Sequence, residues 1–215
     1  MTADARLEAA GLSFRYQTDT PLLESWSARF DPGEVVAVTG PSGRGKSTLL
    51  YLLGLMLKPA AGHVRIDGVE ATGLSDVRRA RLRADRFGFV FQDAALDASR
   101  TVLDNILETA LYRGEDRRTM TGRARDLMEQ FGVALRTEAK PGQVSGGQAQ
   151  RIALCRALLG EPAILLADEP TGNLDQSSSD VVVGALRTQA ARGAAVVIVT
   201  HDPSLVTRCD RKIAL

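Results

Sequence analysis

The sequence predicts an α/β fold in which a parallel sheet is interrupted by an inserted helical block. Continuous apolar runs of strand length, such as Glu34–Thr39 and Ala194–Thr200, are typical of strands that are buried on both faces of a parallel sheet. Helical segments follow these runs, which is the pattern of strand–loop–helix units. Between residues 94 and 160 the apolar spacing becomes that of helices, so we expect this stretch to insert into the sheet domain.

The part of the chain before residue 94 is expected to hold short strands, two helices and a glycine-rich loop. Apolar runs with polar interruptions indicate two antiparallel strands within residues 7–30, joined by a loop at Tyr16–Pro21. Thr48–Leu57 is apolar nearly all round, which indicates a buried helix that Pro59 and Gly62 end. The other expected elements are a strand at Glu34–Thr39, the loop Gly40–Ser47, a strand–turn–strand unit at His63–Val69, a helix at Ser75–Asp85 capped by Ser75 or Asp76, and a strand at Phe87–Phe91.

The part after residue 94 begins with helices and ends as a strand–helix–strand unit. A charged stretch, Gly114–Thr121, is expected to be an exposed loop between the first two helices. The expected elements are helices at Thr101–Tyr112, Thr121–Phe131 and Gly146–Leu159, a strand at Ile164–Ala167, a helix at Ser177–Ala191 and a buried strand at Ala194–Thr200. We expect residues 1–215 to form one domain, with a catalytic α/β lobe (1–93 and 161–215) and a helical lobe (94–160).

The composition excludes several classes of protein. Hydrophobic residues make up 44% and charged residues 25% of the chain, as in an ordinary globular protein, and the net charge of +1 gives no indication of a nucleic-acid partner. No apolar run approaches the roughly 20 residues of a bilayer span, and the N-terminus lacks the pattern of a secretory signal. Cys155 and Cys209 make no disulfide framework, and Cys155 is expected in the core. We therefore expect no direct membrane insertion.

The glycine-rich loop predicts a nucleoside triphosphate site. Gly40–Ser47 matches G-x-x-x-x-G-K-[ST], and it follows a predicted strand and opens a predicted helix. Glycines let successive N–H groups turn onto phosphate oxygens, and the helix N-terminus adds positive charge. In this pattern Lys46 reaches the β- and γ-phosphates, and the Ser47 hydroxyl binds Mg²⁺. The candidate nucleotide-binding residues of the loop are Gly40, Ser42, Gly43, Gly45, Lys46, Ser47 and Thr48.

Two carboxylates follow the apolar strand Ile164–Ala167. The ends of buried strands point at the ligand crevice of an open α/β sheet, so Asp168 is placed to hold Mg²⁺ through its water shell. Glu169, one residue on, is placed to polarise a water for attack on the γ-phosphate. Beside a phosphate loop, this pair predicts a metal-assisted hydrolase.

A second candidate anion site precedes the helix at Gly146–Leu159. Ser145-Gly146-Gly147-Gln148 offers a Ser side chain and consecutive glycine N–H groups at a helix N-terminus. One chain then has two phosphate-binding loops, although ATP has one γ-phosphate. Two chains arranged head to tail resolve this, because each offers its second loop to the nucleotide of the other.

Together these motifs resemble the nucleotide-binding subunit of an ABC transporter, over nearly the whole chain. Ser145–Gln148 matches the signature motif and is the most family-specific element. The other matches, in the order of the family, are Tyr16 for the aromatic that stacks on adenine, Gly40–Thr48 for the phosphate loop, Gln92 for the Q-loop, Ile164–Pro170 for Walker B with the catalytic glutamate, Asn173-Leu174-Asp175 for the D-loop and His201 for the switch histidine. The resemblance implies a P-loop NTPase with a RecA-like parallel core, an N-terminal antiparallel β subdomain and an inserted helical subdomain.

The resemblance also implies roles within the chain's own nucleotide site. Gln92 touches the Mg²⁺ or the attacking water and couples it to the helical lobe. His201 hydrogen-bonds the γ-phosphate or orders the water. Phe14 and Trp26 are the alternatives to Tyr16 as the adenine-stacking ring.

Further implied roles belong to a dimer of two copies. Ser145 and Gly147, with Gln148 in the same motif, bind the γ-phosphate of the ATP held by the second copy, and Asp175 crosses the interface. The sequence is thus expected to be an ATPase that uses ATP and Mg²⁺. A DNA-repair relative would carry a long coiled-coil insertion and a P-loop GTPase an NKxD motif, and the sequence has neither.

Thr171–Asp175 reads TGNLD, which resembles a subgroup that serves macrolide export, lipoprotein release and cell division (MacB-, LolD- and FtsE-like). The first hypothesis is an ATPase that powers an integral membrane permease, of export or mechanotransmission type. The alternative is the ATPase of an FtsEX-like signalling complex, which regulates a cell-wall hydrolase and transports nothing. Either places the chain in the cytoplasm, held at the inner face of the plasma membrane by the permease.

Overall fold

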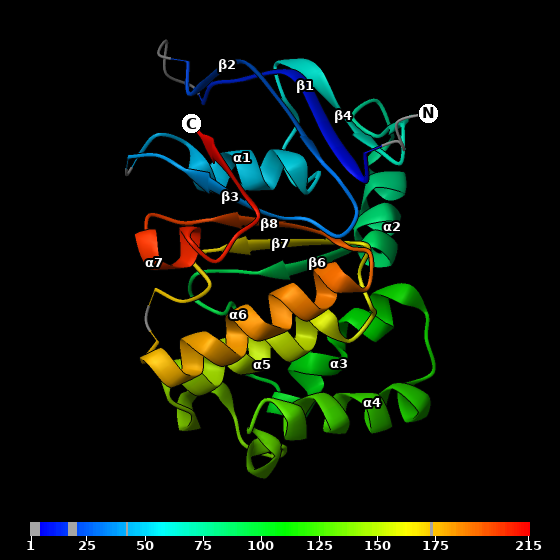
Figure 1. The fold of residues 1–215 in the computed structure, drawn as a ribbon. Coiled ribbons are helices and arrows are strands. Elements are labelled where there is room, and N and C mark those ends of the chain that lie inside the picture. Colours follow the sequence, from blue (N-terminus) through cyan, green and yellow to red (C-terminus); the bar gives the residue numbers. More distant parts are fainter. Residues whose placement is uncertain (1–4, 17–20, 42, 173) are drawn as a thin grey trace.

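The computed structural model describes residues 5–16, 21–41, 43–172 and 174–215. An antiparallel sheet lies at one end, helix α1 (Lys46–Leu53) separates it from a parallel sheet, and a group of helices covers the far face of the parallel sheet (Figure 1). The predicted fold class, an α/β parallel core with an N-terminal antiparallel sheet and inserted helices, is confirmed.

The antiparallel sheet has the strand order β2-β1-β4-β5. Its strands are β1 (Leu7–Phe14), β2 (Leu23–Phe30), β4 (Ala61–Ile66) and β5 (Val69–Glu70). Gly62 in β4 has φ +80°, and a Cβ placed on it would lie 2.2 Å from the carbonyl oxygen of Gly11 in β1. Only glycine allows this close approach of the two strands.

The parallel sheet has the strand order β6-β7-β8-β3-β9, and each neighbouring pair is parallel. The strands are β3 (Val35–Thr39), β6 (Phe87–Val90), β7 (Ile164–Asp168), β8 (Ala195–Val199) and β9 (Arg211–Ala214). Parallel strands place their carboxyl ends at one edge. The segments that follow β3, β7 and β8 therefore meet there.

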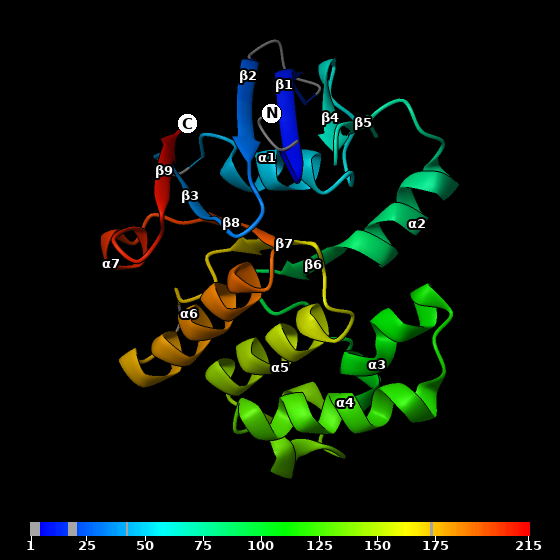
Figure 2. The ribbon, with the colours of Figure 1, turned by 45° about the vertical axis from the view of Figure 1, so that its right-hand side comes forward.

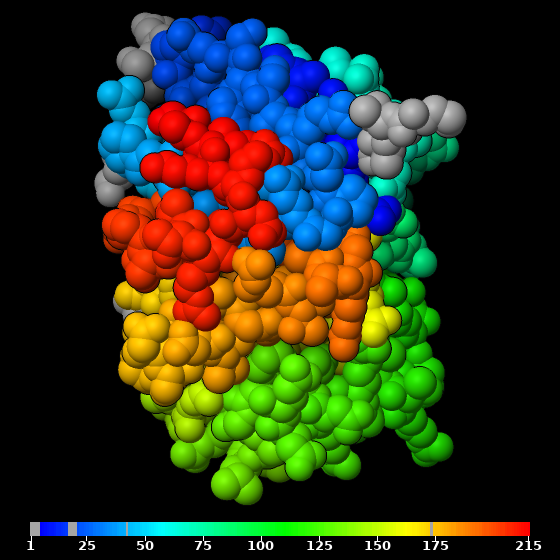
Figure 3. All heavy atoms as spheres, viewed as in Figure 1, coloured from blue at the N-terminus to red at the C-terminus, as the bar shows by residue number. Residues whose placement is uncertain are grey.

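Strand β9 was not predicted, because RKIA is short and begins with two charged residues, and its residues are alternately half-buried and exposed. It pairs with β3, and the guanidinium of Arg211 bonds both carboxylate oxygens of Glu34 at 2.6 and 2.9 Å. In the space-filling view this C-terminal segment, in red, fills the surface between the N-terminal part, in blue, and α6, in orange (Figure 3). The backbone N–H of Leu215 donates to the carbonyl of Thr39 at 2.8 Å, so the strand ends beside the phosphate loop.

The helices that follow α1 are α2 (Asp76–Arg86), α3 (Val102–Arg113), α4 (Arg117–Gln130), α5 (Gly146–Leu158), α6 (Gln176–Ala191) and α7 (Pro203–Val206), with 3-10 turns at Ala134–Arg136 and Pro141–Gln143. Helices α3, α4 and α5 pack together, and α5 and α6 lie on the face of the parallel sheet opposite α1 (Figures 1 and 2). Apolar side chains form one core on each face of this sheet, and Cys155 is fully buried in one of them as predicted. In the described residues no helix is long and apolar enough to cross a bilayer.

The apolar run Thr48–Leu57 predicted the wrong end for the first helix, although its start near Lys46 is confirmed. Helix α1 begins at Lys46, inside the glycine-rich loop, and ends at Leu53 with Gly54 as its C-cap. A Cβ on Gly54 would lie 2.6 Å from the ring of Phe89, so the chain turns there against β6. Pro59 lies beyond the helix, and Gly62 belongs to β4.

The predicted exposed loop Gly114–Thr121 was wrong over its second half. Helix α4 begins at Arg117, because the carboxylate of Asp116 accepts a hydrogen bond of 3.0 Å from the backbone N–H of Thr119 and caps it. The charged residues lie on the exposed side of the helix. The other predicted helices and strands lie within a few residues of their predicted limits.

Candidate functional site

The phosphate loop curls between β3 and α1. Gly43 and Gly45 have φ of +76° and +87°, and a Cβ on Gly45 would lie 2.7 Å from the side chain of Leu22. Glycine is required at Gly45 for both reasons. The ammonium of Lys46 donates to the carbonyls of Gly40 and Pro41 at 2.9 and 3.0 Å, which holds its charge over the loop. The predicted contact Ser42 lies outside the described residues.

Asp168 and Ser47 meet below this loop. Asp168 ends β7 and is 4% exposed, and the Ser47 hydroxyl donates a hydrogen bond to its carboxylate. Burial raises the pKa of Asp168 and the neighbouring charge of Glu169 adds to this, while the bond from Ser47 and the charge of Lys46 oppose it. A buried carboxylate whose negative charge is only partly offset by Ser47 and Lys46 is suited to bind a cation.

Glu169 is held by the residues that follow β8. Its backbone has φ +45°, and its N–H donates to the carbonyl of Val199 at 2.9 Å. The hydroxyl of Thr200 donates to Oε2 at 3.0 Å, and the backbone N–H of His201 donates to Oε1 at 3.1 Å. The ring Nδ1 of His201 lies 2.6 Å from Oε1. The Glu169 side chain is only 10% exposed whereas the His201 ring is 69% exposed, so the ring is free to face a ligand.

A cavity of about 430 Å³ gathers most of the predicted site. Tyr16 stands at its border, 54% exposed, with its hydroxyl 3.1 Å from that of Thr48. Phe14 and Trp26, the alternatives to Tyr16, instead pack against the core between the sheets. The described lining residues are Tyr16, Leu22, Gly43, Gly45, Lys46, Ser47, Thr48, Gln92, Asp168, Glu169 and His201.

Three lining residues fit a divalent cation. Ser47, Gln92 and Asp168 offer a hydroxyl, an amide and a carboxylate oxygen, and all three also line a neighbouring cavity. Oxygen donors are what Mg²⁺ prefers, with water and phosphate oxygens completing its shell. The described residues contain no group of three His, Cys, Asp or Glu side chains placed to bind a metal, so a dedicated all-protein cage is absent from that part of the chain.

The signature residues lie apart from the cavity that holds the phosphate loop. Ser145 caps α5, accepting from the N–H of Gln148 at 3.2 Å, and the Gln148 side chain accepts from the N–H of Ser145 at 3.0 Å. Ser145 is exposed, and none of Ser145, Gly147 and Gln148 lines the cavity. Asp175 caps α6 through Ser177 and Ser178. The structure thus brings together the residues of one half-site and leaves the second anion site facing outward.

Sequence reasoning missed two residues of this site. Thr200 orients Glu169, and it could have been found as the polar residue at the carboxyl end of a buried strand. Leu22 lines the cavity beneath Gly45, and no sequence pattern distinguishes it from an ordinary core leucine. Asn173, of the predicted D-loop, lies outside the described residues.

Comparison with known sequences supports this assembly of motifs. The family model described as ABC transporter matches residues 23–172. The lipoprotein-releasing system ATP-binding protein LolD of Gluconobacter oxydans is 44% identical over 218 aligned positions, which cover 100% of this chain and 94% of LolD. LolD of Bordetella pertussis is 48% identical over 84% of this chain and 79% of its own length. The macrolide export ATP-binding/permease protein MacB 1/2 of Paracoccus denitrificans is 46% identical over 85% of this chain and 27% of that protein.

Comparison with solved structures gives the same result. The dimeric structure of MJ0796, described as a bacterial ABC transporter cassette, has a TM-score of 0.91 and 32% identity, covering 97% of this chain and 94% of that one. A second structure of MJ0796, a dimeric post-hydrolysis state bound to ADP and phosphate, has the same scores.

Proposed function

The chain belongs to the ABC transporter family of ATP-binding cassettes, which are ATPases, and from this we propose that two copies bind ATP and Mg²⁺ between them and drive a membrane partner that releases lipoproteins. The observation that carries the proposal is the single cavity in which Lys46, Asp168, Glu169 and His201 converge. The task of the membrane partner follows from the likeness to LolD, which extends over nearly all of both chains.

Nucleotide binding is assigned to the phosphate loop and Tyr16. The ring of Tyr16 stacks on the adenine, since it stands exposed at the border of the cavity. The N–H groups around Gly43 and Gly45, with the N-terminus of α1, bind phosphate oxygens. When ATP binds, the ammonium of Lys46 replaces its hydrogen bonds to the two loop carbonyls by hydrogen bonds to the β- and γ-phosphates. The ammonium therefore has hydrogen-bond acceptors both before and after ATP binds.

Ser47, Gln92 and Asp168 are the residues assigned to the metal. When bound, Mg²⁺ neutralises charge on the phosphate oxygens and orients the γ-phosphate. Asp168 provides the negative charge, Ser47 fixes its orientation through the hydrogen bond, and Gln92 supplies an oxygen from the segment that leads to the helical block.

Glu169 is assigned as the general base. A water in the cavity gives a proton to the Glu169 carboxylate as its oxygen forms a bond to the γ-phosphorus, and the bond from phosphorus to the bridging oxygen of ADP breaks on the opposite side. ATP and water thus yield ADP and inorganic phosphate. Thr200 and the backbone of His201 fix the carboxylate, while the exposed His201 ring orders the γ-phosphate or the water.

The second copy completes each site. Ser145 is exposed and Gly147 is half-buried at the N-terminus of α5, and both lie outside the cavity of their own chain. We assign them to the γ-phosphate of the ATP in the other copy, and Asp175 to the interface. One relative of similar fold, MJ0796, is dimeric in two solved structures. Closing the dimer with ATP and opening it after hydrolysis provides the mechanical stroke.

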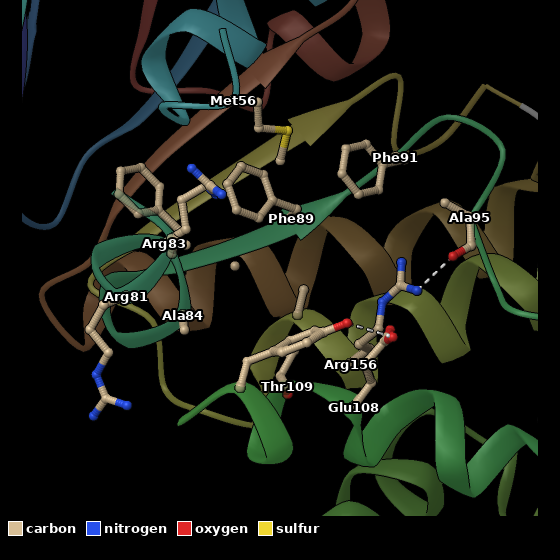
Figure 4. A pocket seen from close by; sticks show the side chains of 15 residues that line it. Met56, Arg81, Arg83, Ala84, Phe89, Phe91, Ala95, Glu108, Thr109 and Arg156 are labelled. Carbon is tan, nitrogen blue, oxygen red and sulfur yellow. Dashed lines mark hydrogen bonds between the residues drawn. The ribbon is translucent and has the colours of Figure 1, made fainter. Parts of the chain in front are cut away.

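A groove of about 590 Å³ is the proposed binding site for the membrane partner (Figure 4). It lies between α2 and β6 on one side and α3 and α5 on the other. Met56, Phe89 and Phe91 give it an apolar floor, and Arg81 and Arg83 make its α2 wall basic. This lining fits a helical segment with an apolar face and an acidic group, offered by the permease at the inner face of the membrane.

Reconstitution tests the proposed task. The chain is purified with the membrane subunit from a neighbouring reading frame and placed in proteoliposomes that hold a lipoprotein. We expect release of the lipoprotein to a soluble acceptor that requires ATP and is lost with Glu169→Gln. ATP hydrolysis without such release, but with macrolide export, would replace lipoprotein release by the MacB-type task that the 46% identity also allows. Hydrolysis with neither activity would favour a signalling ATPase.

A further inference from the structure

The segment that carries Gln92 contains two alanines in an unusual conformation. Ala94 and Ala95 follow β6 with φ of +61° and +45°, in the left-handed region that non-glycine residues adopt only at an energetic cost. Two such residues in succession persist only where the surroundings hold them. The question is which group of the protein does so.

Arg156 of α5 holds both residues. Its Nη1 donates to the carbonyl of Ala95 at 2.7 Å and its Nη2 to the carbonyl of Ala94 at 2.8 Å. Figure 4 shows the guanidinium reaching from α5 to Ala95 at the end of the groove. The residue is only 8% exposed, and its rigid planar fork fixes the directions of both hydrogen bonds, whereas a lysine ammonium is a point charge on a flexible stem.

Two further side chains of the helical block fasten the same segment. Gln150 of α5 donates to the carbonyl of Phe91 at 3.2 Å, one residue before Gln92. Asn105 of α3, fully buried, accepts from the N–H of Asp97 at 2.7 Å and donates to its carbonyl at 3.0 Å. The segment is therefore anchored to the helical block on both sides of Gln92.

Burial works against the charge of Arg156. It lowers the pKa of the guanidinium, and the nearby carboxylates of Glu108 and Asp93 oppose that change. Arg156, Ala95 and Phe91 also line the groove assigned to the membrane partner. The two bonds to the segment thus lie between this groove and the cavity that Gln92 lines.

We propose that Arg156 is a positioning residue for Gln92, because its paired hydrogen bonds keep Ala94 and Ala95 left-handed and so fix where the Gln92 amide lies beside Ser47 and Asp168. This proposal rests on the metal or water role assigned to Gln92 above. It adds that the position of Gln92 depends on α5, the helix whose N-terminus carries Ser145. A segment of the membrane partner that binds in the groove acts on Gln92 through the two hydrogen bonds of Arg156 to Ala94 and Ala95.

Arg156→Lys tests the proposal, with Arg151→Lys as the matched control. Arg151 lies in the same helix but donates to the carbonyls of Gly147 and Phe131, away from the segment. We expect Arg156→Lys to raise amide hydrogen exchange in residues 92–97 about tenfold or more, because local opening becomes easier. The kcat for ATP should fall about tenfold, and the KM should stay within about twofold, since the phosphate loop is untouched. Arg151→Lys should alter neither the exchange nor kcat.

A glycine variant separates positioning from general stability. Ala94→Gly and Ala95→Gly remove the cost of the left-handed conformation, so combining them with Arg156→Lys should restore most of the lost kcat. Unchanged exchange and kcat in Arg156→Lys would overturn the proposal. The proposal would also be overturned if the two glycines failed to restore kcat in Arg156→Lys and if Arg151→Lys lost as much kcat as Arg156→Lys.

Gln92→Ala distinguishes this failure from failure of the proposed function. If kcat is unchanged in Gln92→Ala, the role assigned to Gln92 is wrong and the proposal falls with it. If Gln92→Ala lowers kcat and Arg156→Lys does not, only the positioning role is wrong. The hydrogen exchange of residues 92–97 is measured without nucleotide and does not depend on activity.

Discussion

The carboxylate of Glu169 contacts His201 twice, with Oε1 2.6 Å from the ring Nδ1 and 3.1 Å from the backbone nitrogen. The hydroxyl of Thr200 holds the other oxygen at 3.0 Å. The orientation of Glu169 is thus set by the end of β8, the strand next to β3, which the phosphate loop follows. This rigid arrangement fits a base that must accept one proton at one place.

Glu169→Gln should bind ATP and form a stable dimer while hydrolysing it about 100-fold or more slowly, because an amide cannot accept the proton of the water. Size-exclusion chromatography with ATP and Mg²⁺ measures the dimer, and phosphate release measures turnover. Glu161→Gln is the matched control, since Glu161 is exposed and pairs with Arg123 on the surface. A variant that stays monomeric with ATP, or one that hydrolyses at the wild-type rate, would contradict the assignment.

Lys46→Ala should raise the Kd for ATP on the order of 100-fold, because two charge-assisted hydrogen bonds to phosphate are lost. Isothermal titration calorimetry gives the Kd. Lys58→Ala, which removes a lysine that pairs with the exposed Asp76, should bind ATP normally. Equal affinities for the two variants would refute the assignment of the phosphate loop.

Ser145→Arg should leave ATP binding to the isolated chain intact and abolish dimer formation and turnover, since a bulky cation replaces a hydroxyl at the face assigned to the partner copy. The change also removes a helix cap, worth about 1 kcal/mol. Ser75→Arg removes the cap of α2 and controls for that loss. Normal steady-state turnover in Ser145→Arg would exclude the role across the interface.

Two glycines should respond to alanine in opposite directions. Gly62→Ala places a Cβ 2.2 Å from a backbone oxygen at φ +80°, so we expect a loss of about 2 kcal/mol or more. Gly184 lies in α6, and a Cβ added there would meet no atom within 4 Å apart from the backbone of the helix itself. We therefore expect Gly184→Ala to gain about 0.5–1 kcal/mol from helix propensity. Urea denaturation measures both. Unchanged or increased stability in Gly62→Ala would show that β1 and β4 approach less closely than described, and a loss in Gly184→Ala would contradict the second prediction.

Asp175 should stabilise the fold in a pH-dependent way. Hydrogen bonds from the Ser177 hydroxyl and from Ser178 lower the pKa of its carboxyl from the ordinary 3.8 to about 2. Because the pKa is lower in the folded state, the stabilisation is complete above 3.8 and is lost as the pH falls to about 2. Asp175→Ala should therefore melt at a lower temperature at neutral pH, and the difference should shrink across this window. Asp175→Asn keeps a cap without the charge, and a difference from wild type that stays constant with pH would contradict the prediction.

The residues of the half-site could be predicted because each lies next to a recognisable strand. Lys46 and His201 follow β3 and β8, Asp168 ends β7, and parallel strands bring such positions together. The end of α1 could not be predicted, because it depends on the contact of Gly54 with Phe89, which is distant in sequence. The roles of Thr200 and Arg156 depend in the same way on bonds to Glu169 and Ala94 that only the folded chain makes.

The strand order of the parallel sheet has a consequence for how the protein is made. Strand β3, which supports the phosphate loop, pairs only with β8 and β9 among the described strands, and both lie within residues 195–214, far later in the chain. A ribosome adds roughly 5–20 residues per second, so the nascent phosphate loop waits on the order of ten seconds for the strands that flank it. The antiparallel sheet, built from residues 7–70, can form much earlier. Competence to bind nucleotide is therefore acquired only after β8 and β9 have been added to the chain.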